Sequence, residues 1–247
     1  MGIVDLARFL FAAAAAGQAV LGLAYHDSTF RLIFALFLLA GAIGLCIPKT
    51  ALPGVLAIAL HQLVWAVIAI PATPLVPVNW YGTAEALTSL SAALLLAAML
   101  DSRLAERGAR IAQIVFGATC VFYGWSHFAY ADYTASMVPN WLPAHLPFAY
   151  LTGVGHAAAG LGVIAGVLPH LAAFCEAIMM SLFGLLVWLP SFFADPKPSW
   201  AAEPKNQWTE VATNWILAFA AFVVAFYLMR RKSERQEAGL AMRQGEA

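Results

Sequence analysis

The sequence predicts an all-α membrane protein with eight transmembrane helices, arranged as two parallel four-helix repeats. The chain has 247 residues, of which 62% are hydrophobic and only 11% are charged, and its mean hydropathy is +0.79. Soluble domains carry about 25% charged residues. The apolar stretches are long enough to cross a bilayer as helices, which takes about 20 residues. In addition, parts of the sequence recur along the chain.

Eight stretches have the length and composition of a spanning helix, and none shows the alternation of a membrane β-strand. In chain order they are Leu6–Tyr25, Phe30–Ile47, Ala51–Ile70, Trp80–Leu100, Ile111–Tyr130, Pro147–Val167, Leu168–Leu189 and Val211–Leu228. The polar segment Asp101–Arg110 separates the first four from the last four. The loop before the sixth stretch contains Pro139, Pro143 and Pro147, which suppress regular structure.

Lysine and arginine residues are unequally divided between the two sides of the predicted bundle. The side of the N-terminus carries ten of the 13, namely Arg8, Lys49, Arg103, Arg107, Arg110, Arg230, Arg231, Lys232, Arg235 and Arg243. The other side carries Arg31, Lys197 and Lys205. Because basic residues concentrate on the cytoplasmic side of a membrane protein, we expect both termini to be cytoplasmic.

An internal repeat determines the predicted domain organisation. Matching positions include Tyr25 with Tyr130, Asp27 with Asp132, Pro71 with Pro190, and Glu85 and Thr88 with Glu210 and Thr213. The offset between the copies changes only where loops fall. We therefore expect a first four-helix repeat at 1–103, a second at 104–230 and a cytoplasmic tail at 231–247. With four spans in each copy the repeats are parallel.

The repeat also identifies candidate site residues, because the two copies differ at three ionisable positions. His127, His156 and Glu176 of the second copy correspond to Gly22, Phe37 and Ala57 of the first. A central Arg, Lys or Asp costs about 2.5–3.5 kcal/mol to insert into a membrane helix. The first copy forms the same spans without these groups, so packing alone does not require them.

These residues predict a ligand-binding pocket that opens on the extracytoplasmic side. His127 and His156 would hold the ligand, Tyr123 and Trp125 would form the walls, and Glu176 would lie deeper. Three interpretations stay open: a hydrogen-bonded polar cluster that locks helices together, a small-molecule or quinone site, and direct metal or haem ligation. Separate spans contain Cys46, Cys120 and Cys175, which form no CxxC motif and do not favour a dithiol oxidoreductase.

The second copy resembles the DoxX-like bacterial membrane proteins. The resemblance rests on SHFAYADYTASMVPNWLPAHLPFAYLTGVGHAAAGLGVIAG, on LVWLPSFF and on QWTEVATNWILAFAAF, and extends over Ile111–Phe226. It implies a four-helix module in the bacterial inner membrane, linked to redox systems that use quinone. It also implies that His127 is the family histidine. Many relatives carry an acidic residue near the position of His156.

The sequence therefore predicts a DoxX-like inner-membrane component of a redox or quinone-linked system, with a small-ligand pocket. The alternatives are a transporter or carrier of a small lipophilic molecule, and a structural subunit that anchors a partner. The expected partners are the lipid bilayer, quinone and other redox subunits. The formal net charge is zero, so nothing indicates a nucleic-acid partner. These residues do not distinguish a catalytic oxidoreductase subunit from a non-catalytic one.

Overall fold

The computed structural model describes residues 2–245, and every regular element in that range is helical. Four long helices form the first half: α1 (Ile3–Ala24), α2 (Thr29–Cys46), α3 (Ala51–Ile68) and α4 (Tyr81–Leu100). The second half contains α5 (Ala105–Ala129), a short α6 (Ala131–Met137), α7 (His145–Ala165), α8 (Pro169–Phe183) and α10 (Pro204–Gly245). After α8 come one π-helical turn, η4 (Gly184–Trp188), and α9 (Leu189–Ser191). The all-helical class is confirmed.

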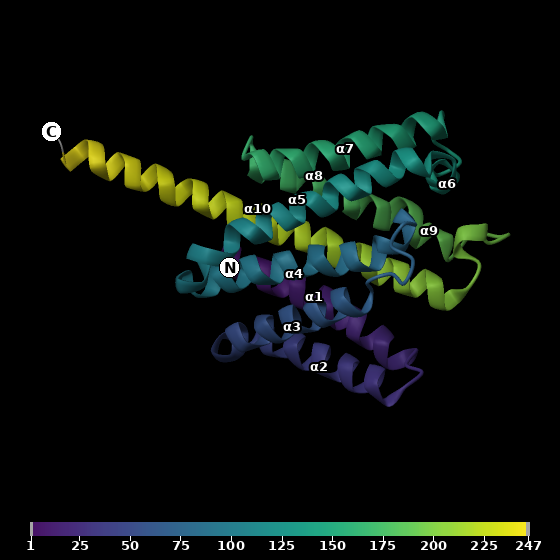
Figure 1. The fold of residues 1–247 in the computed structure, drawn as a ribbon, viewed down its shortest axis with the longest axis horizontal. Coiled ribbons are helices and arrows are strands. Elements are labelled where there is room, and N and C mark those ends of the chain that lie inside the picture. Colours follow the sequence, from purple (N-terminus) through teal and green to yellow (C-terminus); the bar gives the residue numbers. More distant parts are fainter. Residues whose placement is uncertain (1, 246–247) are drawn as a thin grey trace.

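Seven helical segments among the described residues are long and apolar enough to cross a membrane, so the chain is a polytopic membrane protein. They are Ile3–Ala24, Thr29–Cys46, Pro48–Ile68, Pro77–Leu100, His145–Ala165, Pro169–Ser191 and Pro204–Gln244. The expected fifth span, within α5, is not among them, although α5 has 25 residues and lies alongside the others (Figure 1). Gln113, Ser126 and His127 lower its hydropathy. The count of eight spans therefore stays a prediction.

Helices pack in the order in which they follow one another along the chain. In the first half α1 contacts α2, α2 contacts α3, and α3 contacts α4, while in the second α5 contacts α7, α7 contacts α8, and α8 contacts α10. The halves meet where α4 packs on α5 and on α10, and where α1 packs on α10. The division of the chain into two four-helix repeats, at 1–103 and 104–230, stays a prediction.

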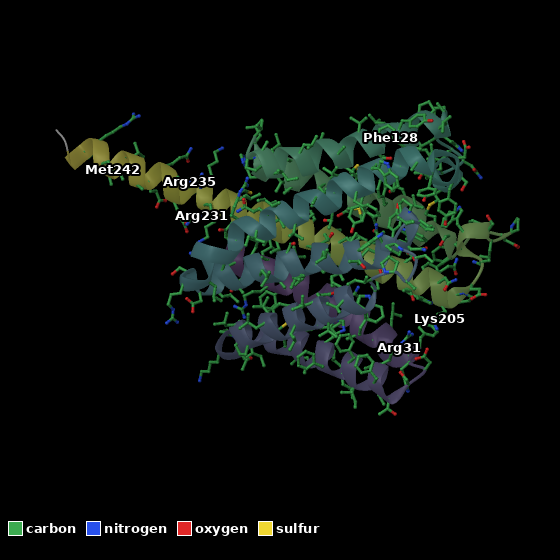
Figure 2. All side chains as sticks on the ribbon, in the orientation of Figure 1. Arg31, Phe128, Lys205, Arg231, Arg235 and Met242 are labelled. Carbon is green, nitrogen blue, oxygen red and sulfur yellow. The ribbon has the colours of Figure 1, made fainter. Side chains whose placement is uncertain are left out.

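Both termini lie at one end of the bundle, which we call the terminal face (Figure 1). Arg231 and Arg235 lie at this end, and Arg31 and Lys205 lie at the other (Figure 2). The predicted separation of basic residues between two faces therefore holds for these residues. The tail does not begin a new element at residue 231, because α10 continues as one helix to Gly245 and extends beyond the bundle. Ion pairs from Arg230 and Arg231 to Glu234 support this extension.

Arginine side chains join the first two helices of each half at the terminal face. The buried guanidinium of Arg8 donates from Nε to the carbonyl of Leu45 at 3.1 Å and from Nη2 to that of Cys46 at 3.1 Å. In the second half, Arg110 Nη2 donates to the carbonyl of Ile164 at 2.6 Å. The last carbonyls of a helix have no partner within it. These arginines therefore satisfy the ends of α2 and α7.

Glycines bring α5 and α7 into unusually close contact. A Cβ atom on Gly117 would lie 2.7 Å from the carbonyl oxygen of Gly160, and one on Gly124 would lie 2.7 Å from that of Gly153. Side chains of any size would separate the helices at these two levels. Small residues allow such close backbone approach in membranes, where helix association depends on packing. As a result, side chains beside these glycines on α5 and α7 meet directly.

Candidate functional site

Four of the five residues predicted to bind a ligand come together in the second half. Tyr123 and His127 lie on α5, His156 on α7 and Glu176 on α8. The ring centroids of His127 and His156 are 4.9 Å apart, and those of Tyr123 and His156 are 5.9 Å apart. We call Tyr123, His127, His156 and Glu176 the imidazole cluster. It lies between helices, next to the glycine contacts of α5 and α7.

Trp125, the fifth predicted residue, does not join the cluster. Its side chain is 42% exposed, and its ring packs against those of Phe122 and Tyr130. The helical period explains this position. Trp125 is two residues from both Tyr123 and His127, which places it about 200° around the helix from either. Trp125 therefore faces outward from the bundle and does not form a wall beside the imidazoles.

A buried imidazole–carboxyl pair forms the inner part of the cluster. His156 Nδ1 lies 2.7 Å from Glu176 Oε1, and the two side chains are only 2% and 3% exposed. The second carboxyl oxygen, Oε2, is enclosed and has no hydrogen-bond partner, although the Cys120 thiol lies beside the carboxyl. A buried charge that loses its partner is strongly destabilising. His156 and Glu176 are therefore coupled in stability.

Contacts on α7 determine which nitrogen of His127 carries a proton. Its Nδ1 lies 2.9 Å from Thr152 Oγ1 and 3.3 Å from the carbonyl oxygen of Ala149. The single hydroxyl proton of Thr152 is directed to the backbone, at 2.9 Å from the Phe148 oxygen and 3.0 Å from that of Ala149. Both neighbours of Nδ1 are then acceptors, so Nδ1 must be the donor. In the neutral ring, Nε2 is left as a hydrogen-bond acceptor.

The Nε2 atoms of both histidines remain available. Neither makes a hydrogen bond to any described residue. His156 is fully buried and His127 is partly buried, so both rings lie inside the bundle. Each of these two neighbouring imidazoles thus leaves one nitrogen without a hydrogen bond in the described chain.

Phe183, which the sequence analysis did not identify, covers the two imidazoles. Its ring centroid lies 6.1 Å from that of His127 and 5.8 Å from that of His156. The π-helical turn η4 begins at the next residue, Gly184. Pro190 lacks the N–H that would bond back to Leu186, which favours a local widening of the helix. Single π-helical turns occur frequently at functional sites. Pro190 was the only sequence signal for this feature.

The first half also contributes to the site, through α4. Thr88 Oγ1 is 3.0 Å from the hydroxyl of Tyr123 and 2.8 Å from Thr119 Oγ1, and the Tyr81 hydroxyl donates to Ser126 Oγ. The cluster is therefore supported by both halves. The described part of the chain contains no group of three or more His, Cys, Asp or Glu side chains placed to hold a metal ion.

Comparison with known families identifies the same region. The DoxX family model matches residues 108–189, which run from the start of α5 to the start of α9 and contain the whole imidazole cluster. No curated protein and no solved structure matches the chain. The match overlaps the resemblance over residues 111–189 and does not extend to its last part, residues 190–226. Residues 108–189 are thus similar to the DoxX family, and the likeness to DoxX proteins is carried by this segment of the chain.

Proposed function

We propose that this protein is a membrane component of a quinone-linked redox system and that the imidazole cluster binds the quinone ring. The observation that carries the proposal is the pair of adjacent imidazoles, 4.9 Å apart, whose Nε2 atoms have no hydrogen-bond partner in the described chain. A hydrogen-bonded cluster that served only to hold helices together would satisfy these nitrogens. Unpartnered polar atoms inside a membrane protein are costly and favour a functional role.

The protonation of the cluster suits a ring with exchangeable oxygens. His127 Nε2, as an acceptor, can take a hydrogen bond from the hydroxyl of a hydroquinone. His156 Nδ1 is engaged with Glu176 at 2.7 Å, which leaves its Nε2 for a second ring oxygen. The oxidised quinone would instead accept a hydrogen bond from an imidazole N–H group. The cluster would therefore offer a partner to both states of the ligand.

Access would depend on Phe183. Its ring packs on both imidazoles, and the π-helical turn that follows is a local irregularity in an otherwise regular helix. We propose that Phe183 rotates to admit the ligand and then stacks on its ring. For the whole protein, we propose the bacterial inner membrane with both termini in the cytoplasm, because the sequence predicts ten of the 13 basic residues on the side of the N-terminus.

A binding titration tests this function. Detergent-purified protein is titrated with a short-chain ubiquinone or menaquinone analogue, and binding is followed by tryptophan fluorescence quenching. We expect His127→Ala to weaken binding about tenfold or more, since one hydrogen bond to the ligand is lost. His26→Ala is the matched control, because His26 is an exposed histidine of the first half that bonds only to the carbonyl of Leu23.

Equal affinity of wild type, His127→Ala and His26→Ala for the quinone analogue would contradict the proposal. Retention of a single elution peak in gel filtration ensures that the variant is folded. Saturable uptake and counterflow of a small lipophilic substrate in proteoliposomes, without quinone binding, would support the transporter alternative. Absence of both activities, with full stability of His127→Ala, would support a structural anchor.

A further inference from the structure

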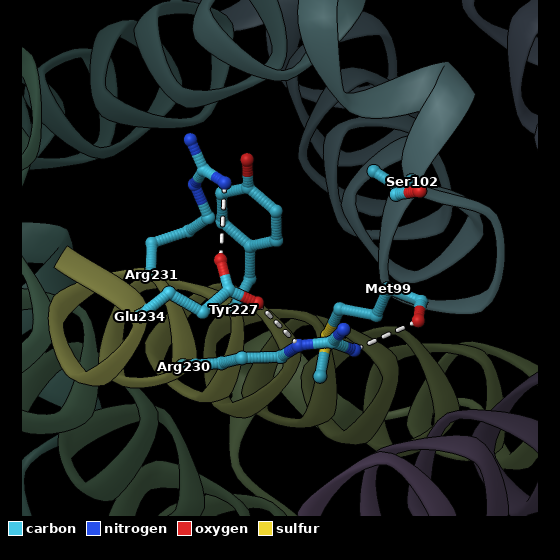
Figure 3. A pocket seen from close by; sticks show the side chains of 7 residues that line it. Met99, Ser102, Tyr227, Arg230, Arg231 and Glu234 are labelled. Atoms are coloured by element: carbon cyan, nitrogen blue, oxygen red, sulfur yellow. Dashed lines mark hydrogen bonds and ion pairs between the residues drawn. The ribbon is translucent and has the colours of Figure 1, made fainter. Parts of the chain in front are cut away.

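A separate cavity lies at the terminal face, between α4 and α10, and its lining includes no residue of the imidazole cluster. Its volume is about 60 Å³, and it is lined by Ala98, Met99, Ser102, Tyr227, Arg230, Arg231 and Glu234 (Figure 3). By comparison, a cavity needs about 10–15 Å³ by the same measure to hold one water molecule. The space is therefore larger than a single water molecule needs and can hold a small polar group.

The cationic side of the cavity is held in place by Glu234. Arg230 Nε donates to Glu234 Oε1 at 2.9 Å, and Arg231 Nη1 donates to Glu234 Oε2 at 3.0 Å. Arg230 Nη1 also donates to the carbonyl of Met99 at 2.9 Å. The carboxylate therefore keeps two guanidinium groups together that would otherwise repel each other. With two arginines and one glutamate, the cavity carries a net positive charge.

Donors remain available after these bonds are made. A guanidinium group has five N–H donors, and Arg231 is bonded through Nη1 alone, so its Nε and Nη2 groups have no partner in the described chain. Ser102 and Tyr227 add hydroxyl groups to the lining. Arginine forks match the geometry of phosphate oxygens and bind them bidentately. The cavity thus combines a suitable charge, size and set of donors for a phosphate group.

The depth of the cavity agrees with a ligand at the membrane surface. α4 ends at Leu100, and the apolar part of α10 ends at Met229, immediately before Arg230. Lining residues therefore come from the last apolar turn and the first charged turn of the same helix. This is the level at which lipid phosphates lie, and basic residues next to a membrane span attract anionic lipids.

We propose that this cavity is a binding site for a phosphate ester, with Arg231, Tyr227 and Ser102 as its donors. The phosphate can belong to the headgroup of an anionic lipid or to a small soluble ester, and the chemistry of recognition is the same. Arg230 acts chiefly in positioning, because it links Glu234 to the backbone of α4. This site is independent of the quinone site and involves no residue of the imidazole cluster.

The test uses the full chain in a mild detergent and native mass spectrometry. The probes are dioleoyl phosphatidylglycerol, dioleoyl phosphatidylcholine as a zwitterionic control, and glycerol 3-phosphate as the soluble ester. Arg231→Gln removes the free donors. Arg235→Gln is the matched control, since it makes the same change of charge one turn further along α10, outside the cavity.

We expect wild type and Arg235→Gln to retain phosphatidylglycerol in preference to phosphatidylcholine, and Arg231→Gln to bind it about tenfold more weakly or worse. Binding of glycerol 3-phosphate with the same dependence on Arg231, without lipid retention, would identify the soluble ester as the ligand. If wild type and Arg231→Gln bind phosphatidylglycerol equally well, and also bind glycerol 3-phosphate equally well, the proposal is overturned. An equal loss in Arg235→Gln would overturn it too, since it would indicate attraction by charge alone. If Arg231→Gln fails to fold, Tyr227→Phe and Ser102→Ala replace it with the same expected weakening.

Discussion

Substitution of Gly124 by alanine tests how the imidazole cluster is positioned. The added Cβ would lie 2.7 Å from the carbonyl oxygen of Gly153 and 2.8 Å from the backbone nitrogen of Ala157. Ordinary contacts of a Cβ atom begin near 3.4 Å. The two helices must therefore separate by roughly 0.7 Å at this level. His127, one turn further along α5, would move away from His156 with them.

The expected cost follows from this overlap. Overpacking of a close contact destabilises a protein by about 1–3 kcal/mol, which for a chain of this size corresponds to a fall in Tm of about 2–12 °C. The matched control is Gly17→Ala on α1, where a Cβ would meet nothing within 4 Å. That change should be neutral or stabilising by up to about 1 kcal/mol, because alanine favours the helix more than glycine does.

The two variants are compared by thermal unfolding in detergent and by the quinone-analogue titration. We expect Gly124→Ala to lower the Tm and to weaken binding, and Gly17→Ala to do neither. Gly124→Ala with wild-type Tm and wild-type affinity would refute the reasoning, because it would mean that close contact between α5 and α7 does not position the cluster. A loss of equal size in both variants would refute it as well.

Three further predictions concern stability, measured by denaturant titration or thermal unfolding in detergent. His156→Phe should lower the free energy of unfolding by about 3–5 kcal/mol, because it leaves the Glu176 carboxyl unpaired. Adding Glu176→Ala should recover much of that loss, and a double-mutant cycle measures the coupling energy. Additive effects of the two substitutions would contradict this pairing. Arg8→Ala should cost about 1.5–3 kcal/mol because the end of α2 loses two carbonyl partners, whereas Arg31→Ala, which breaks an exposed pair, should cost less than about 1 kcal/mol; equal costs would contradict the capping role. The hydrogen bond from Arg230 lowers the pKa of Glu234 below its ordinary value of 4.5. The stability that this carboxylate contributes is therefore present above pH 4.5 and is lost as the pH falls further. A difference in Tm between wild type and Glu234→Gln that does not shrink below that pH would contradict the contribution of the Arg230–Glu234 ion pair.

The fold class could be predicted from composition because a bilayer imposes strong constraints. A chain in lipid satisfies its backbone either as helices of about 20 apolar residues or as a closed β-barrel, and the long apolar stretches of this sequence favoured helices, which the structure has. The π-helical turn at Gly184 was not predictable in the same way. It depends on local backbone geometry near Pro190, which hydropathy does not record. The unbroken continuation of α10 to Gly245 also escaped prediction, because a charged sequence is compatible with either a helix or an irregular tail.

The site was predictable in part, for reasons that concern particular residues. Comparison of the two copies selected His127, His156 and Glu176, because an ionisable group in a membrane helix stands out against an apolar counterpart. The same comparison could not find Phe183, since an aromatic residue in an apolar helix carries no signal until its neighbours are known. Trp125 was assigned to the pocket by its proximity in sequence, although the helical period places it on another face of α5.

The glycine contacts show the same limit. Gly117 and Gly124 are seven residues apart on α5, and their partners Gly160 and Gly153 have the same spacing on α7. That spacing keeps each pair on one helix face. The pairing of the two faces is a tertiary fact, however, and the sequence contains other glycines at similar spacing. The sequence alone therefore does not indicate which helices approach most closely.

The most direct measurement of the central proposal is photoaffinity labelling of the membrane-embedded protein with an azido-quinone, followed by peptide mapping. We predict that the label attaches to α5, α7 or α8 in peptides that contain His127, His156 or Phe183, and that excess unlabelled quinone prevents it. Label confined to the first half, or label on these peptides that unlabelled quinone does not reduce, would contradict a quinone site at the imidazole cluster.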